Sequence, residues 1–159
     1  MKSQGEIEAA VCDGISRFQQ EFIGRGPRDI HAHLIGNLLV VRLQGVLTAA
    51  ERQLINPRPG PAGNGGPAAD GHAGTGAGAG SGVGHGNGHG DHGNGRALLK
   101  QVRSHMVASG RPRLEEIVRV ATGVGMVSVH HDISTVTGEE VIVFSLADPP
   151  ACRTKKGAK

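Results

Sequence analysis

Residues 29–45, DIHAHLIGNLLVVRLQG, decide the fold of this chain. Two runs rich in Leu, Ile and Val flank the pair Gly36-Asn37. A glycine at the first position of a two-residue loop favours a type II′ turn, because glycine accepts the positive φ required there. The stretch therefore predicts a β-hairpin.

Two tetrapeptides in the predicted strands are apolar at every position, LLVV at 38–41 and VIVF at 141–144. A strand with one solvated face alternates apolar and polar residues, so four consecutive apolar residues indicate a sheet that is covered on both sides. We expect a partner subunit to cover the second face, which predicts a homodimer.

Helices are predicted on either side of this hairpin. Ser3 and Glu6 form an S-x-x-E capping box, and the helix that follows ends at GRGP, residues 24–27. Thr48 and Glu51 repeat the box and begin a shorter helix. The apolar positions of the first helix are Ile7, Val11, Ile15, Phe18 and Phe22. Helix, strand, strand and short helix are therefore expected in this order.

The C-terminal part repeats this order. Residues 96–108, RALLKQVRSHMVA, resume helical periodicity, and residues 111–123, RPRLEEIVRVATG, predict a helix with proline near its start and glycine at its end. Residues 126–134 and 139–146 predict a second hairpin around TVTGE. The apolar face expected for residues 96–108 consists of Leu98, Leu99, Val102 and Met106.

Together these elements predict an α+β fold with two layers. Helix-strand-strand occurs twice around one four-stranded sheet, mixed or antiparallel, with extra helices between the repeats. The order of the strands is left open. Residues 1–56 and 96–150 are expected to form this single domain. Residues 151–159 form a basic tail, which we interpret as a solvated terminus capable of transient contact with anionic lipid.

Residues 57–95 have a different composition. They hold 16 of the 27 glycines and a single residue of the Leu, Ile, Val, Met and Phe group, Val83. Such a segment buries too little apolar surface to offset the entropy lost on ordering, so we predict a disordered insert. Its imidazoles suit Zn or Ni, but glycine does not preorganise ligands, so only weak binding is expected. The candidate metal ligands are His72, His85, His89 and His92.

A second group of polar residues lies in the predicted strands. If Ile30 faces the core, His31 and His33 share the opposite face of the first strand, and His130 and Asp132 share one face of the third. These side chains would converge on a metal or general-base site if the two strands were neighbours. The alternative is that they are the polar residues of an outward face.

Composition and motifs exclude several classes of function. The chain has three Phe and no Trp or Tyr, so it lacks the stacking platforms of single-strand nucleic-acid binders. It contains no Walker A loop, G-x-S-x-G elbow or H-E-x-x-H motif, and we predict neither an enzyme nor a tightly bound cofactor. There is no apolar run of membrane-spanning length and no hydrophobic signal core, so a cytoplasmic protein is expected.

Three segments resemble the bacterial MpsC family, namely GRGP at 24–27, VVRLQGVLTAAERQL at 40–54 and VSVHHDISTVTGEEVIVFSL at 127–146. The resemblance implies a soluble component of a sodium-translocating, membrane-potential-generating system, whose membrane subunits are related to inorganic-carbon uptake machinery. We therefore expect a non-enzymatic accessory protein that binds membrane transporter subunits. Peripheral association with the inner face of the membrane is left open. A metal-binding or metal-buffering protein that acts through the insert is the alternative function.

The resemblance also selects a candidate surface. Capping and turn formation account for many of the matching positions, but not for Arg25, Arg42, His130 and Asp132. With Thr135 of the last hairpin, these four residues form the predicted partner or ligand surface.

Overall fold

The computed structural model describes residues 1–56 and 91–153. The predicted elements are present in the predicted order, and the two hairpins are confirmed. The elements are α1 (Gln4–Ile23), β1 (Asp29–Ile35), β2 (Leu38–Gln44), α2 (Ala49–Ile55), α3 (Asp91–Ser109), α4 (Arg111–Thr122), β3 (Met126–Ile133) and β4 (Glu140–Leu146).

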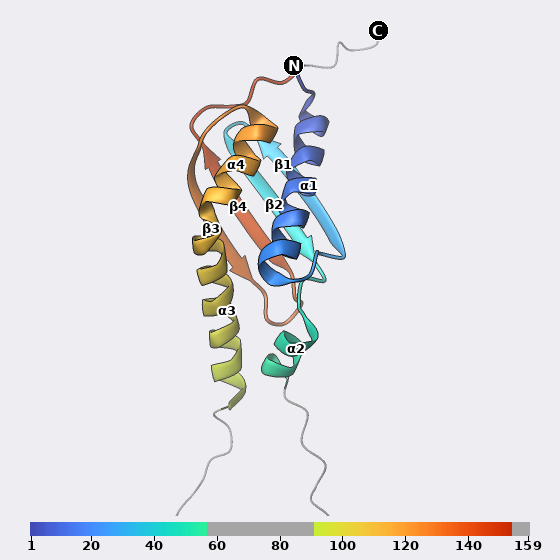
Figure 1. The fold of residues 1–159 in the computed structure, drawn as a ribbon, viewed down its shortest axis with the longest axis vertical. Helices are drawn as coiled ribbons and strands as arrows, with labels where there is room; N and C mark the ends of the chain where they lie inside the picture. Colours follow the sequence, from blue (N-terminus) through green and yellow to red (C-terminus); the bar gives the residue numbers. More distant parts are fainter. Residues whose placement is uncertain (57–90, 154–159) are drawn as a thin grey trace, which may run out of the picture.

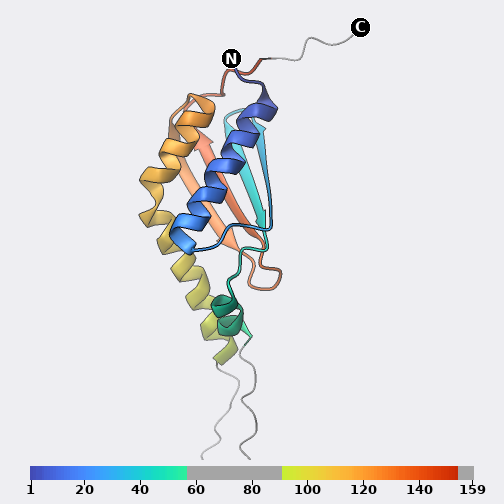
Figure 2. The same ribbon diagram turned by 45° about the vertical axis from the view of Figure 1, so that its right-hand side comes forward.

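The four strands form one antiparallel sheet in the order β1-β2-β4-β3. Helices α1 and α4 pack on each other and lie over the same face of the sheet (Figure 1). A view turned by 45° shows the two layers (Figure 2). Helix α2 lies beyond one end of the sheet beside the N-terminal part of α3, and the C-terminal part of α3 reaches the sheet at β3. The α+β prediction is confirmed, and the second strand pair joins the first through β2 and β4.

The first hairpin has the predicted turn. Gly36 has φ 61°, and no described residue other than glycine has a positive φ. Positive φ is therefore confined to the first position of the Gly36-Asn37 loop, as a type II′ turn requires. The loop sets the register in which Ile35 pairs with Leu38 and His31 pairs with Arg42.

Both predicted capping boxes are formed. The Ser3 hydroxyl accepts a hydrogen bond from the Glu6 amide at 3.3 Å, and the Glu6 carboxylate accepts one from the Ser3 amide at 2.6 Å. Thr48 and Glu51 make the same reciprocal pair at 3.2 and 2.7 Å. Each box satisfies amides that the first helical turn leaves unpaired, which fixes where α1 and α2 begin.

Helix α3 differs from its prediction in the residues it buries. It begins at Asp91, before the expected start at residue 96. Its buried face carries Leu99, Arg103 and Val107, whereas Leu98 and Val102 are 46% and 40% exposed. Leu99 is buried as predicted and Met106 is half-buried, but the prediction was wrong for Leu98 and Val102. The buried face turns toward Arg103 instead, a charged residue that apolar periodicity does not indicate.

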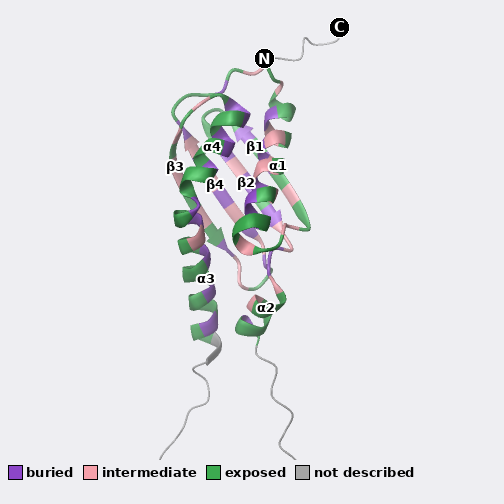
Figure 3. Cartoon of the chain, in the orientation of Figure 1, coloured by how far each residue is buried: buried purple, intermediate pink, exposed green. Residues whose placement is uncertain are grey.

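The core lies between the helices and one face of the sheet, seen as the buried residues in Figure 3. Helix α1 contributes Ile7, Val11, Ile15 and Phe18 as predicted, while the predicted Phe22 is exposed and stacks on the Phe18 ring. In the part of the chain that the structure describes, no helix has the length and apolar character needed to cross a membrane.

Candidate docking surface

The sheet face turned away from the helices is exposed and is called the outer face below. Alternate residues of each strand point to it, so it contains half of every strand. Among the described residues, its members are Asp29, His31, His33, Ile35, Leu38, Val40, Arg42, Gln44, Ser128, His130, Asp132, Val141, Val143 and Ser145.

The outer face has an aliphatic centre. LLVV and VIVF do place apolar side chains on both sides of the sheet: Leu39, Val41, Ile142 and Phe144 are buried in the core. Leu38, Val40, Val141 and Val143 point outward from the two central strands. Ile35 and Leu38, at the end of the first hairpin, are 63% and 36% exposed. That a partner covers this surface stays a prediction.

Three of the predicted surface residues lie on the outer face. Arg42 is on β2, in the same cross-strand row as Val141 and Asp132. Its guanidinium Nε donates to the Glu139 carboxylate at 2.8 Å, and this hydrogen bond lowers the pKa of Glu139. The Arg42 pair therefore ties the start of β4 to β2 and presents a neutralised ion pair at the surface.

Asp132 and His130 occupy the edge strand β3. The Lys100 ammonium of α3 donates to both Asp132 carboxylate oxygens, at 2.8 and 3.1 Å. This hydrogen bond lowers the pKa of the Asp132 carboxyl. His130 lies one row further along, with its ring nitrogen 3.4 Å from the Ser128 hydroxyl. Both side chains are exposed and lie at the rim of the aliphatic centre.

The suggested site of three imidazoles and a carboxylate is not formed. His31 and His33 lie on β1 and His130 and Asp132 on β3, at opposite edges of the sheet. Two strands separate them, which corresponds to about 14 Å at about 4.8 Å per strand spacing. His31 pairs instead with Asp29 at 3.1 Å on its own strand. The four residues share a face, as the alternation predicted, but not a site.

The other two predicted surface residues lie away from the outer face. Arg25 follows α1 and directs its guanidinium toward the Leu47 carbonyl at 3.5 Å. Thr135 is half-buried in the turn between β3 and β4. The structure thus brings three of the five predicted residues onto one surface. Of the predicted metal ligands, His72, His85 and His89 lie outside the described residues, and the His92 side chain is not described.

A buried polar cluster, which the sequence reading missed, lies on the opposite side of the sheet. Arg103 of α3 is fully buried and uses every donor of its guanidinium. Its Nε and Nη2 donate to the two Glu51 oxygens at 2.7 and 2.8 Å. Its Nη1 donates to Gln19 and Glu140 at 3.3 and 3.2 Å, and Nη2 also donates to the Val46 carbonyl at 2.9 Å.

His131 extends this group, called the Arg103 cluster below (Gln19, Glu51, Arg103, His131 and Glu140). His131 Nε2 lies 2.7 Å from Glu140 Oε1, and Gln19 donates to Glu140 Oε2 at 2.9 Å. In the described chain, the His131 Nδ1 atom is buried without a hydrogen-bond partner. The cluster joins α1, α2, α3, β3 and β4, so its first role is to hold the layers together.

Electrostatics support that role. Burial raises the pKa of the Glu51 carboxyl, but the hydrogen bonds from Arg103 and from the Thr48 amide outweigh burial, so the pKa of Glu51 is lowered. A buried carboxylate remains charged only when such partners compensate its desolvation. The sequence did contain a signal for this cluster, because Arg103 lies four residues from both Leu99 and Val107 and His131 alternates with His130 and Asp132.

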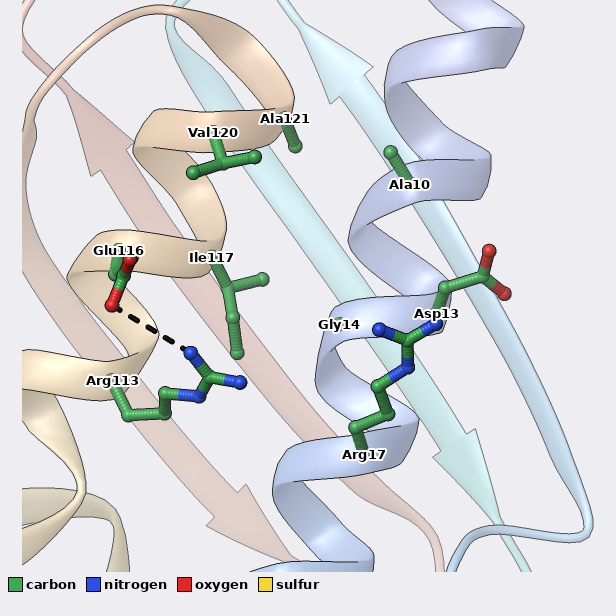
Figure 4. A pocket seen from close by; sticks show the side chains of 9 residues that line it. All are labelled: Ala10, Asp13, Gly14, Arg17, Arg113, Glu116, Ile117, Val120 and Ala121. Atoms are coloured by element: carbon green, nitrogen blue, oxygen red, sulfur yellow. Dashed lines mark ion pairs between the residues drawn. The ribbon is translucent and has the colours of Figure 1, made fainter.

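A shallow hollow lies between α1 and α4. It has a volume of about 300 Å³, and Gly14 permits the close approach of Ile117 at its floor. Arg17 and Arg113 face each other across it, and Arg113 pairs with Glu116 at 3.6 Å (Figure 4). Asp13 and Glu116 balance the two arginines. The walls therefore favour neither sign of ligand charge, and the outer face is the stronger candidate surface.

Comparison with known proteins places the chain among bacterial relatives. It is 26% identical over 147 residues to the uncharacterized protein YbcI of Bacillus subtilis strain 168, an alignment that covers 92% of this chain and 90% of YbcI. No solved structure matches. The family model described as Na+-translocating membrane potential-generating system (MpsC) matches residues 3–62 and 90–148. Because this match covers most of the chain, the protein belongs to the MpsC family.

Proposed function

We propose that this protein is a non-catalytic binding component of a Na+-translocating, membrane-potential-generating system, and that it assembles through its outer face. The description of the MpsC family supports a role in this system. The observation that supports the mode of action is a sheet face that no helix of the described chain covers. Val40, Val141 and Val143 are half-buried at its middle, beside the Arg42–Glu139 ion pair, and Leu38 is exposed at the hairpin end. The edge strands carry Asp29, His31, His33, His130 and Asp132. Protein interfaces combine an apolar centre with a polar rim in this way.

The arrangement of the polar groups favours binding over catalysis. Arg42 and Asp132 are each held in an ion pair with a neighbouring side chain, Glu139 and Lys100. A site that combines a general acid with a general base needs both side chains within hydrogen-bond reach of the same substrate. On this face the imidazoles of β1 and β3 lie at opposite edges. Polar groups this far apart can contact an extended partner surface but not a single small substrate.

The membrane subunits of the system are the proposed partners, and the protein meets them as a peripheral component on the cytoplasmic side. Val40 and Val143 pair across β2 and β4 at the middle of the outer face. Lysine at these positions places a charge at the centre of the contact, where desolvating an unpaired ammonium is costly. Such substitutions should therefore disrupt assembly while leaving the core intact.

The test is recovery of the membrane subunits with the protein from native membranes solubilised in mild detergent. Nickel resin is avoided because of the histidines in residues 57–95. We expect the wild-type chain to retain the subunits, and Val40→Lys with Val143→Lys to reduce their recovery about tenfold or more. Val120→Lys is the matched control, because Val120 is a 63% exposed valine on α4. Failure of the wild type to retain any subunit overturns the proposal.

A further inference from the structure

We infer that a second copy of this chain covers the outer face, so that the protein forms a dimer with its two sheets packed face to face. This inference rests on the proposed role of the outer face as an assembly surface. It makes a second copy the direct occupant of that face, and the membrane subunits then bind the dimer rather than the outer face of a single copy. Three properties of the face support a second copy: the position of its aliphatic residues, the pattern of its charges and its size.

Three of the four side chains at the middle of the outer face, where a two-fold axis would cross it, are aliphatic: Val40, Val141 and Val143. The fourth is Arg42, which is neutralised by Glu139. Leu38 and Val40 belong to β2, and Val141 and Val143 belong to β4, the two central strands of the sheet. In a face-to-face dimer, a two-fold axis through the middle of the sheet places central strands on central strands. The valines of the two copies then pack against one another as in a β-sandwich, with the Arg42–Glu139 ion pair of each copy beside them.

The polar groups at the edges of the face can also meet under the same symmetry. One cross-strand row runs from His31 to Asp132, and the next runs from His33 to His130. When the axis runs along the strands, Asp132 lies opposite His31 of the second copy. When the axis crosses the strands between these rows, Asp132 lies opposite His130 of the second copy. Either arrangement places an imidazole beside the Asp132 carboxylate at the rim, where it can add a hydrogen bond to the one from Lys100.

The sign of the charge argues against an anionic membrane surface as the occupant. Asp29 and Asp132 accompany Arg42 on the outer face, and Glu139 pairs with Arg42 at its border. A surface that binds anionic lipid presents an excess of Lys and Arg. Mixed charge around an aliphatic centre suits another protein surface of the same kind.

The size of the face is at the lower limit for a specific interface. β1, β2 and β4 have 7 residues each and β3 has 8. At about 3.4 Å per residue and about 4.8 Å between strands, the face measures roughly 24 by 19 Å. Its corrugated side-chain surface exceeds this projected area, so two copies together bury roughly the 1,000 Å² that a specific interface requires.

The experiment measures the molar mass of the purified full-length protein by sedimentation and light scattering over a dilution series. We expect twice the chain mass of 16.3 kDa for the wild type. Val143→Lys should yield a folded monomer or raise the dimer dissociation constant about tenfold or more, whereas Val120→Lys should remain dimeric. If Val143→Lys does not fold by circular dichroism, Ile35→Lys with Leu38→Lys replaces it, since both side chains are already exposed.

The outcomes separate this inference from the proposed function. A wild-type monomer, or a dimer that all folded outer-face lysine variants preserve, overturns the inference. If such a monomer still retains the membrane subunits, the proposed function stands and those subunits occupy the outer face. A dimer that the lysine substitutions dissociate, but that retains no membrane subunit, supports the inference and overturns the proposed function.

Discussion

Charged side chains are buried on the inner side of the sheet and exposed on its outer face, although the same alternating strands form both faces. On the inner face, Arg103 and Glu140 are fully buried, and each is held by several hydrogen bonds. On the outer face, Arg42 and Asp132 make single ion pairs in contact with solvent. Removing water makes the inner contacts indispensable for the fold, while the outer contacts remain free to exchange for those of a partner.

The largest expected effect is the loss of unfolding free energy when the buried Arg103, rather than the exposed Arg42, is replaced. Arg103→Met removes the guanidinium that pairs with both carboxylates. Glu51 loses both of its hydrogen bonds from Arg103, and Glu140 keeps only its contacts with Gln19 and His131. Breaking a buried ion pair in this way costs about 3–5 kcal/mol. Chemical denaturation should show this loss in the free energy of unfolding.

The control for this prediction is Arg42→Met on the outer face. Arg42 pairs with one carboxylate, and its side chain is 52% exposed. Exposed ion pairs contribute about 0–1 kcal/mol, so the free energy of unfolding should change little. Equal losses for the two variants would show that the Arg103 cluster is not a distinct structural element.

The residues of the outer face could be predicted from the sequence, but the polar residues buried on the inner side could not. The alternation of side chains along a strand correctly predicted that His31, His33, His130 and Asp132 share one face. Gly36 correctly predicted the turn of the first hairpin. Both predictions depend only on residues that are neighbours in the sequence. Strand order depends on contacts distant in sequence, and alternation carries no information about it. Arg103 was missed because a charged residue is buried only when partners from other elements compensate it, and those partners are known only from the fold.

Packing on the inner side provides the second prediction. A Cβ atom at Gly110, between α3 and α4, would lie 2.3 Å from Cε2 of the Phe18 ring. Gly110→Ala should therefore overpack the junction and cost about 1–3 kcal/mol of unfolding free energy. Thermal denaturation measures this effect. Gly5→Ala is the control, because a Cβ there meets no neighbouring atom within 4 Å; destabilisation by Gly5→Ala of equal size would contradict the packing argument.

Two adjacent valines of β2 give the third prediction. Val41 is fully buried in the core, and Val40 points to the outer face. Val41→Thr buries a hydroxyl without a compensating donor or acceptor and should cost about 1–3 kcal/mol at any protein concentration. Val40→Thr should alter the stability of the monomer by about 0.5 kcal/mol or less.

Measuring the two variants at several protein concentrations makes the comparison between Val40→Thr and Val41→Thr more specific. If the outer face is a dimer interface, the destabilisation by Val40→Thr should grow as the protein concentration rises, because dimer formation stabilises the folded wild type by mass action. The destabilisation by Val41→Thr should not show this additional dependence. Denaturation at several protein concentrations distinguishes the two, and identical concentration dependence would contradict the assignment of the faces.

The smallest expected effect concerns the rim of the outer face. The hydrogen bond from Lys100 lowers the folded-state pKa of Asp132, so the pair contributes stability above the unfolded pKa of Asp, and this contribution is lost as pH falls through the lowered value. Lys100→Met should raise the Asp132 pKa toward its ordinary value, which NMR titration of the carboxyl group measures. Because the Asp132 side chain is 73% exposed, added salt should weaken the shift in the wild type. A pKa that is insensitive to both the substitution and salt would mean that Lys100 does not engage Asp132 in solution, and that Asp132 is already free to meet a partner.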